Sequence, residues 1–275
     1  TNGTVWEAPV LVESSDLPAT TPHITALGKG DFLIVWAQAW KVVNGANWGY
    51  YSARFVNGQG FEPRQDVMVY SDNQSLSVGE HPRIAGDGNG NALMAGTLHD
   101  ATWNHMSVRS KLYVAGIGWD DGVNLSTESV QTAHSPSVAM DKNGNAIVVY
   151  SQDTGTSSSV QGVHAAYHSV CGSWDLPTVI ESAKIATTRP GWGPRVAFDG
   201  AGNAIVVRYQ YGLSGIYTNR RTSDGTWGVT KAIGDPTVPA ATYDEGVQLA
   251  VQANGNAMAV WNQYGGVLYG SHYIA

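Results

Sequence analysis

The feature that most constrains the fold is a glycine-containing turn, followed by an apolar run, that recurs along the chain. The clearest copy reads Asp-Lys-Asn-Gly-Asn-Ala-Ile-Val-Val-Tyr over residues 141–150. Further copies cover residues 87–94, 199–207 and 252–261, and a degenerate copy covers 27–36. The shared glycines are Gly30, Gly90, Gly144, Gly202 and Gly255, spaced 53 to 60 residues apart. A period of this length is typical of a fold built from repeated supersecondary units.

Each repeat predicts four short strands. The first strand follows a proline in most copies, and a proline at the start of a strand costs no ladder hydrogen bond. The second strand, such as 146–149, is continuously apolar and is expected to be buried on both faces. The third is aromatic and half-polar, and the fourth begins at a bulky aromatic after a glycine turn. These aromatics are Phe61, Trp119, Trp174 and Trp227.

The two ends of the chain predict how the repeats close. The last repeat ends at Ala275 without an aromatic fourth strand, whereas residues 3–13 read like an unattached one. We therefore expect the N-terminal strand to complete the last sheet and leave no long open edge. The predicted fold is an all-β, five-bladed β-propeller of four-stranded antiparallel blades, with a non-closed β-solenoid as the alternative. Residues 1–275 form one domain, with blades near 20–70, 80–127, 134–182, 192–235 and 245–275 plus 3–13.

The repeat resembles those of secreted bacterial β-propeller proteins. The resemblance rests on the pattern Pro-x-Val-Ala-x-Asp-x-x-Gly-Asn-Ala-Ile-Val-Val-Trp/Tyr, followed by an aromatic strand and Gly-x-Trp, and it covers nearly the whole chain. It implies an architecture, because the activity of that repeat class is mostly unassigned. The layout also resembles that of small propeller lectins, although no sugar-pocket motif of a lectin matches residue by residue.

Composition and charge exclude several kinds of partner. The net charge of −7 is unsuited to nucleic acid, which requires a basic surface. No apolar run is long enough to insert into a membrane. Few charged residues, with many Trp and Tyr, favour a secreted, periplasmic or cell-surface location. No motif predicts a cofactor.

Function is expected on the face that carries the variable loops, because turns of uniform length serve the scaffold. Aromatic rings beside amide, carboxylate and imidazole groups suit a sugar, whose C–H face stacks while its hydroxyls are hydrogen-bonded. The predicted ligand-binding residues are Trp40, Trp48, His99, Asp100, Trp103, His105, Trp192 and Arg195. Packing of the loops onto the scaffold is the alternative role for the aromatic residues.

A second candidate site lies where the chain runs into each first strand. Polar groups would converge there at the mouth of a central channel. A metal or acid–base site could use Glu80, His81, His134 and Glu245. No local ligand spacing supports such a site, so polar capping of the strand ends is the competing interpretation, and no metal is predicted.

Three features of the repeat concern side chains that recur or are missing at one position. Blade two has Gly96 where the other blades have large residues, which predicts a pocket beside Trp103. A recurring glutamine, as at Gln38, indicates either one ligand site per blade or a hydrogen bond between neighbouring blades, and we favour the bond. The turn aspartates, such as Asp141, predict capping rather than calcium binding, because the calcium-loop pattern is absent.

These observations favour a secreted carbohydrate-binding protein whose partner is a glycan or another extracellular ligand. A polysaccharide-active hydrolase or lyase is the first alternative. No pair of positioned carboxylates is identifiable, so an enzyme is the less favoured interpretation. A protein-interaction scaffold in a surface assembly is the second alternative.

Overall fold

The computed structural model describes most of the chain as strands joined by turns. The described residues are 6–13, 15–42, 46–69, 81–99, 105–126, 132–153, 161–185, 193–210, 215–235, 246–263 and 267–275. Their strands form five separate antiparallel sheets, which we call A to E in chain order. Within this part of the chain there is no helix long and apolar enough to cross a membrane.

The strands divide among the sheets as follows. Sheet A contains β1 (Ala19–Gly28), β2 (Asp31–Val42), β3 (Ala46–Val56), β4 (Gly60–Phe61) and β5 (Gln65–Met68). Sheet B contains β6 (Arg83–Gly86), β7 (Ala92–His99), β8 (Met106–Val114), β9 (Gly118–Trp119) and β10 (Val123–Asn124). Sheet C contains β11 (Ala133–Met140), β12 (Ala146–Asp153), β13 (Gln161–His168) and β14 (Thr178–Ile185). Sheet D contains β15 (Arg195–Phe198), β16 (Ala204–Gln210), β17 (Gly215–Arg221) and β18 (Lys231–Ala232). Sheet E contains β19 (Val247–Val251), β20 (Ala257–Gln263) and β21 (Val267–Tyr273).

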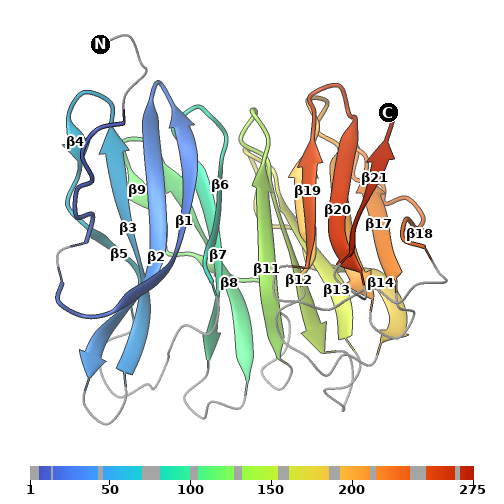
Figure 1. The fold of residues 1–275 in the computed structure, drawn as a ribbon, viewed down its shortest axis with the longest axis horizontal. Coiled ribbons are helices and arrows are strands. Elements are labelled where there is room, and N and C mark those ends of the chain that lie inside the picture. Colours follow the sequence, from blue (N-terminus) through green and yellow to red (C-terminus); the bar gives the residue numbers. More distant parts are fainter. Residues whose placement is uncertain are drawn as a thin grey trace.

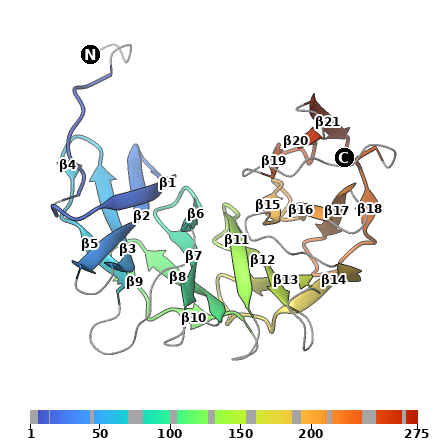
Figure 2. The same ribbon diagram turned by 60° about the horizontal axis from the view of Figure 1, so that its bottom comes forward.

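The sheets stand side by side and fan around a common axis. The first strands β1, β6, β11, β15 and β19 follow one another along the inside of the fan (Figure 2). Viewed from the side, the sheets run from sheet A, with β4 and β5, at the left to sheets D and E, with β18 and β21, at the right (Figure 1). The inner strands therefore bring residues from all five repeats towards the axis.

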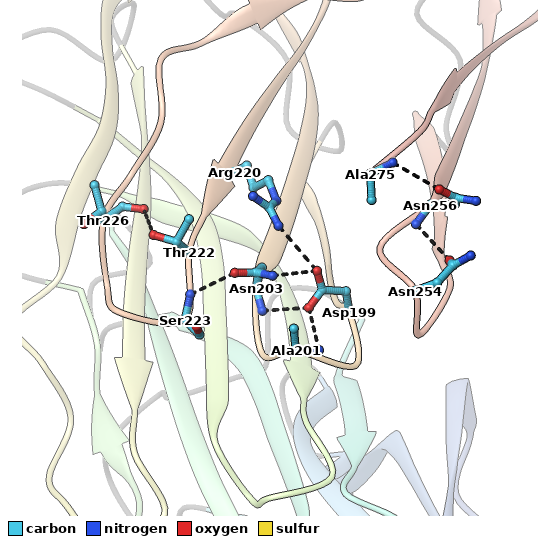
Figure 3. Close-up of polar contacts among 10 residues, drawn as sticks. All are labelled: Asp199, Ala201, Asn203, Arg220, Thr222, Ser223, Thr226, Asn254, Asn256 and Ala275. Carbon is cyan, nitrogen blue, oxygen red and sulfur yellow. Dashed lines mark hydrogen bonds and ion pairs between the residues drawn. The ribbon is translucent and has the colours of Figure 1, made fainter.

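The repeated turn is closed by its aspartate, as predicted. In sheet D, Asp199 Oδ1 accepts hydrogen bonds from the amides of Ala201 and Asn203, both at 2.9 Å, and Oδ2 accepts one from the Asn203 side chain at 2.8 Å (Figure 3). The Asn203 Oδ1 in turn accepts from the Ser223 amide at 3.0 Å. Asp87 and Asp141 hold the same bonds in sheets B and C. The oxygens of these aspartates therefore accept hydrogen bonds from their own turns and serve the scaffold.

The apolar second strands form the cores between sheets. Every residue of β12 is buried, because sheets pack against both of its faces. Apolar clusters join A to B, B to C, C to D and D to E. Burial between neighbours, rather than one central core, holds the repeats together.

The fourth-strand aromatics lock each sheet onto the one before it. Trp119 of sheet B packs against the A–B core and donates from Nε1 to Ser52 Oγ of sheet A at 2.9 Å. Trp174 packs in the B–C core, and Trp227 in the C–D core. Each aromatic faces the third strand of its own sheet, in the pairs Phe55–Phe61, Tyr113–Trp119, His168–Trp174 and Arg221–Trp227.

The predicted closure of the ring is not observed. Residues 6–13 form no strand, and within the described residues sheet E ends at β21. Sheets A and E lie at the two ends of an open arc (Figure 2). The base of the N-terminal segment is fixed to sheet A instead: Val12 packs against its aromatic cluster, and Glu13 Oε2 accepts from Gln38 Nε2 at 2.9 Å.

Two smaller predictions also need correction. Gly96 opens no pocket, because the Tyr50 ring of sheet A occupies the space beside it; a Cβ on Gly96 would lie 2.3 Å from Tyr50 Cε2. The buried Gln38 bonds to Trp36, Glu13, Leu17 and Arg64, which belong to sheet A and the segment before it, rather than to a neighbouring sheet.

Candidate functional site

One register position of the inner strands places a polar residue at the axis in every sheet. The position lies opposite Val35 in sheet A, Ala95 in B, Val149 in C, Val207 in D and Val260 in E. Its residues, which we call the axial ring, are His23, Arg83, Ser137, Arg195 and Gln248. The innermost strands thus supply a set of hydrogen-bonding side chains at one level of the fold.

Backbone bulges set this register in two of the sheets. The pairing of β1 shifts by one residue between Thr20 and His23, and that of β11 shifts between His134 and Ser137. Each bulge contains a residue with positive φ, namely Thr21 at 54° and Ser135 at 54°. Non-glycine residues rarely adopt this conformation, and bulges re-aim the side chains that follow them. The strain falls directly before the axial ring.

The electrostatics of the ring are dominated by its arginines. The Arg83 guanidinium donates from Nη1 to His23 Nε2, with 3.1 Å between the nitrogens, so His23 is neutral in this pairing. Burial, followed by the positive charges of Arg83, Arg195 and His81, lowers the pKa of His23 to about 4. At neutral pH the positive charge of the ring therefore comes from Arg83 and Arg195.

Arg195 holds the axial position of sheet D. Its positive charge also contributes, after burial and Arg83, to the lowered pKa of His23 in sheet A. Its Nη1 also donates to the Pro194 carbonyl at 3.2 Å. The segment before it packs closely against sheet C, because a Cβ on Gly193 would lie 2.4 Å from the Ser135 carbonyl oxygen. Glycine is required there for the close approach of the two backbones.

The chemistry of the ring residues suits an anion or a hydroxyl-rich ligand. Two guanidinium groups supply fixed donors, Ser137 and Gln248 supply neutral polar groups, and none of the five ring residues is acidic. Guanidinium groups suit carboxylates and phosphates, because their paired N–H donors match two oxygens. Side chains of this kind are suited to recognition of a ligand.

Four of the predicted ligand residues are described, and they lie at the same end of the sheets: Trp48, His99, His105 and Arg195. Arg195 belongs to the axial ring, and His99 and His105 flank the β7–β8 connection. Trp48, on β3, is half-buried against the A–B core and contributes to packing. The backbone of Trp40 lies in β2, and its side chain is outside the described set; Asp100, Trp103 and Trp192 also lie outside it.

The proposed metal or acid–base set is only partly visible. His81 is exposed and acts on His23, whereas His134 is buried with Nδ1 3.1 Å from Ser135 Oγ. Glu80 and Glu245 lie outside the described residues. The described part of the chain contains no group of three or more His, Cys, Asp or Glu residues able to hold a metal ion.

Sequence reasoning missed four of the five ring residues, namely His23, Arg83, Ser137 and Gln248. The first three directly follow the prolines that mark the first strands, at Pro22-His23, Pro82-Arg83 and Pro136-Ser137. Alignment of the residue after each proline, in the register Pro22, Pro82, Pro136 and Pro194, gives His, Arg, Ser and Arg. Comparison of this position across the copies would have identified four of the five ring residues, whereas Gln248 follows no proline.

Solved structures of similar shape establish the class of fold. The BP39L lectin from Burkholderia pseudomallei aligns over 99% of this chain and 72% of its own, with 12% identity and a TM-score of 0.62. The six-bladed β-propeller lectin of Aleuria aurantia aligns over 94% and 74%, with 13% identity and a TM-score of 0.51. The NanB sialidase of Streptococcus pneumoniae, as a K499G mutant, aligns over 91% and 58%, with 9% identity and a TM-score of 0.56.

No protein-family model matches the sequence, and no curated protein is similar to it in sequence. The chain is all-β, with five antiparallel sheets and propeller-like structural neighbours. At identities of 9 to 13%, this similarity concerns the fold alone.

Proposed function

We propose that this protein binds carbohydrate and that its axial ring contacts an acidic group of the glycan. The observation that carries the proposal is that Arg83 and Arg195 occupy the same register position on the first strands of two sheets, with Arg83 in hydrogen-bonding contact with His23. In a chain with a net charge of −7, two arginines at one register position favour an anionic ligand there. A carboxylated or sulfated sugar carries such a charge.

The structural neighbours support this choice of ligand class. Two of them are lectins and another is a sialidase, so carbohydrate is the ligand class named for proteins of this shape. The predicted sugar contacts His99 and His105 lie at the same end of the sheets as the ring, where they can meet the neutral part of a longer glycan. A secreted or cell-surface location belongs to the same proposal.

A panel of matched neutral and acidic glycans tests it. We expect uronic-acid, sialylated or sulfated glycans to bind, and their neutral analogues to bind at least tenfold more weakly. Arg83→Met and Arg195→Met should each weaken binding of the acidic glycan about tenfold, which corresponds to about 1.4 kcal/mol. Lys142→Met removes the same charge at an exposed turn at the opposite end of the sheet and should leave affinity unchanged.

Two results would contradict the proposal. Acidic glycans bound with full affinity by both arginine variants would place the site elsewhere, and the absence of binding to every acidic glycan would exclude the ligand class. The same glycans should be analysed for cleavage products. Catalytic turnover would instead assign the chain to the polysaccharide-active enzymes.

A further inference from the structure

A groove lies between sheets D and E. At the other boundaries between neighbouring sheets, an aromatic ring packs at the corresponding place. The groove has a volume of about 470 Å³, and its walls include Ile205, Arg220, Ile233, Leu249, Ala259 and Tyr273. Between A and B, B and C, and C and D, the rings of Trp119, Trp174 and Trp227 pack against the cores. Each of these rings pairs with the third strand of the later sheet, Trp119 in β9 and Trp174 and Trp227 in single bridges before β14 and β18. Sheet E shows three strands in the described residues.

The register identifies the residue of sheet E that a fourth-strand aromatic would face. In sheet D, Arg221 lies opposite Ala204 in the ladder and faces Trp227. The equivalent residue in sheet E is Tyr273, which lies opposite Ala257. Tyr273 lines the groove and is 43% exposed. The groove and Tyr273 therefore mark the same place, where the aromatic side chain of a fourth strand would pack.

The pairing of the aromatic with the third strand is accompanied by a backbone hydrogen bond. The residue after each aromatic donates its amide to the third strand: Glu62 to Arg54, Asp120 to Leu112, Asp175 to Tyr167 and Gly228 to Arg220, at 2.8 to 2.9 Å. The equivalent acceptor in sheet E is the carbonyl of His272. An edge strand such as β21 can accept an added strand through bonds of this kind.

The N-terminal arm, residues 6–11, has the sequence of a fourth strand. Trp-Glu-Ala-Pro-Val-Leu-Val at 6–12 matches Trp-Asp-Leu-Pro-Thr-Val-Ile at 174–180 in aromatic, acid, proline and strand-forming positions. The Trp6 side chain is 98% exposed and Leu11 is 80% exposed. Exposed apolar groups of this size are typical of a surface that binds a partner.

The attachment of the arm at its base determines whether it can reach sheet E of its own chain or that of another copy. Val12 packs against Trp36, Tyr51 and Ala53, and Glu13 bonds to Gln38, so the arm starts from sheet A. Sheet A lies at the opposite end of the arc from β21 (Figure 2). In this conformation the arm extends away from the β21 of its own chain, and a second copy can present its β21 to it.

We propose that the arm of one copy adds to sheet E of a second copy as its fourth strand. Trp6 occupies the groove between sheets D and E and faces Tyr273, and the Glu7 amide donates to the His272 carbonyl. The two surfaces differ, so the contact is head-to-tail rather than two-fold symmetric. This interaction is independent of glycan binding at the axis.

Directed disulfide formation tests the register. Cys171 is exposed and is first replaced by serine to remove the native thiol. Glu7→Cys and His272→Cys are made on separate chains and mixed under mild oxidation. Residues directly opposed in a hydrogen-bonded antiparallel pair have Cα atoms about 5.5 Å apart, which suits a disulfide. We expect a covalent dimer whose linked peptides contain one cysteine of each kind.

Trp6→Ala should reduce the yield of this dimer at least tenfold, because it removes the ring that fills the groove. Ile117→Ala is the matched control: Ile117 is 84% exposed in the β8–β9 turn, and its loss should leave the yield unchanged. No mixed dimer at high protein concentration would overturn the proposal. So would a chain carrying both cysteines that links only to itself, since that result assigns the strand to its own sheet E.

Discussion

The Tyr50 ring of sheet A fills the space that a side chain at Gly96 of sheet B would need. Its Oη both donates to the Thr97 carbonyl and accepts from the Thr97 amide, each at 3.2 Å, and the ring is fully buried. A methyl group at Gly96 would lie 2.3 Å from Cε2. Sheets A and B therefore approach closely at this point, because the large Tyr50 ring packs where Gly96 has no side chain.

Gly96→Ala should consequently destabilise the protein. The buried Tyr50 ring must move to admit the methyl group, and overpacking of this kind costs about 1–3 kcal/mol. Denaturant unfolding monitored by circular dichroism measures the change. Gly270→Ala on β21 is the control, because its methyl group would meet Val260 Cγ1 at 3.4 Å, and we expect a change below about 0.5 kcal/mol there.

Asp199→Asn should weaken the repeated turn at neutral pH. Burial raises the pKa of Asp199, but the bonds from the Asn203 side chain, the Asn203 and Ala201 amides and the charge of Arg220 outweigh it and hold the pKa below the usual value. The carboxylate therefore adds stability above the pKa of the unfolded state, and this contribution is lost as pH falls through the lower folded value.

The substitution should cost about 1–3 kcal/mol at pH 7 and progressively less below about pH 4. Unfolding curves at several pH values give the comparison. Asp121→Asn, at an exposed position, serves as the control. A loss of stability for Asp199→Asn that is the same at pH 3 and pH 7 would show that shape, rather than charge, accounts for the effect.

His23→Gln should reduce the sensitivity of the fold to mild acid. The folded pKa is about 4 and the unfolded pKa is near 6.5, so the unfolded chain binds the extra proton between these values. Stability then rises with pH across this window and is lost as pH falls through it. The variant should remove up to one proton from the slope of unfolding free energy against pH, measured by denaturant unfolding at several pH values; an unchanged slope would contradict the role of His23.

Trp119→Phe should weaken the contact between sheets A and B. The ring remains, with its edge contact to Tyr113 at 5.4 Å, but the bond to the buried Ser52 Oγ is lost. Removal of one such bond costs about 1 kcal/mol. Trp174→Phe is the matched control, because among the described residues the Trp174 indole N–H makes no hydrogen bond. Equal losses in the two variants would assign the effect to ring size.

Local chemistry explains what could be predicted from the sequence. The turn at Asp199 closes through residues two and four positions away, so its motif carries its own hydrogen-bond partners. The strand order within each sheet follows from the same local repeat. The fourth-strand aromatic, such as Trp227, was also recognisable because each copy places it after a similar turn.

The remaining features depend on residues that are distant in the chain. The partner of Gly96 is Tyr50, in another sheet, and nothing near Gly96 in the sequence indicates a ring there. The contact of Arg83 with His23 joins two sheets across 60 residues of the chain, so the prolines indicate members of the axial ring but not which of them touch. The open arc depends on how five sheets stack, and the attachment of Val12 to sheet A is a contact that the repeat does not encode.

The direction in which the fourth-strand tryptophans point has a consequence for biosynthesis. Trp119, Trp174 and Trp227 each fasten their sheet to the one that precedes it in the chain. Because the ribosome synthesises the N-terminal sheets first, the sheet on which each new sheet packs has already been synthesised. Because couplings run mainly between neighbours, assembly can proceed from the N-terminus one sheet at a time. A nascent chain released after sheet C or D would then keep the inter-sheet contacts it had already formed.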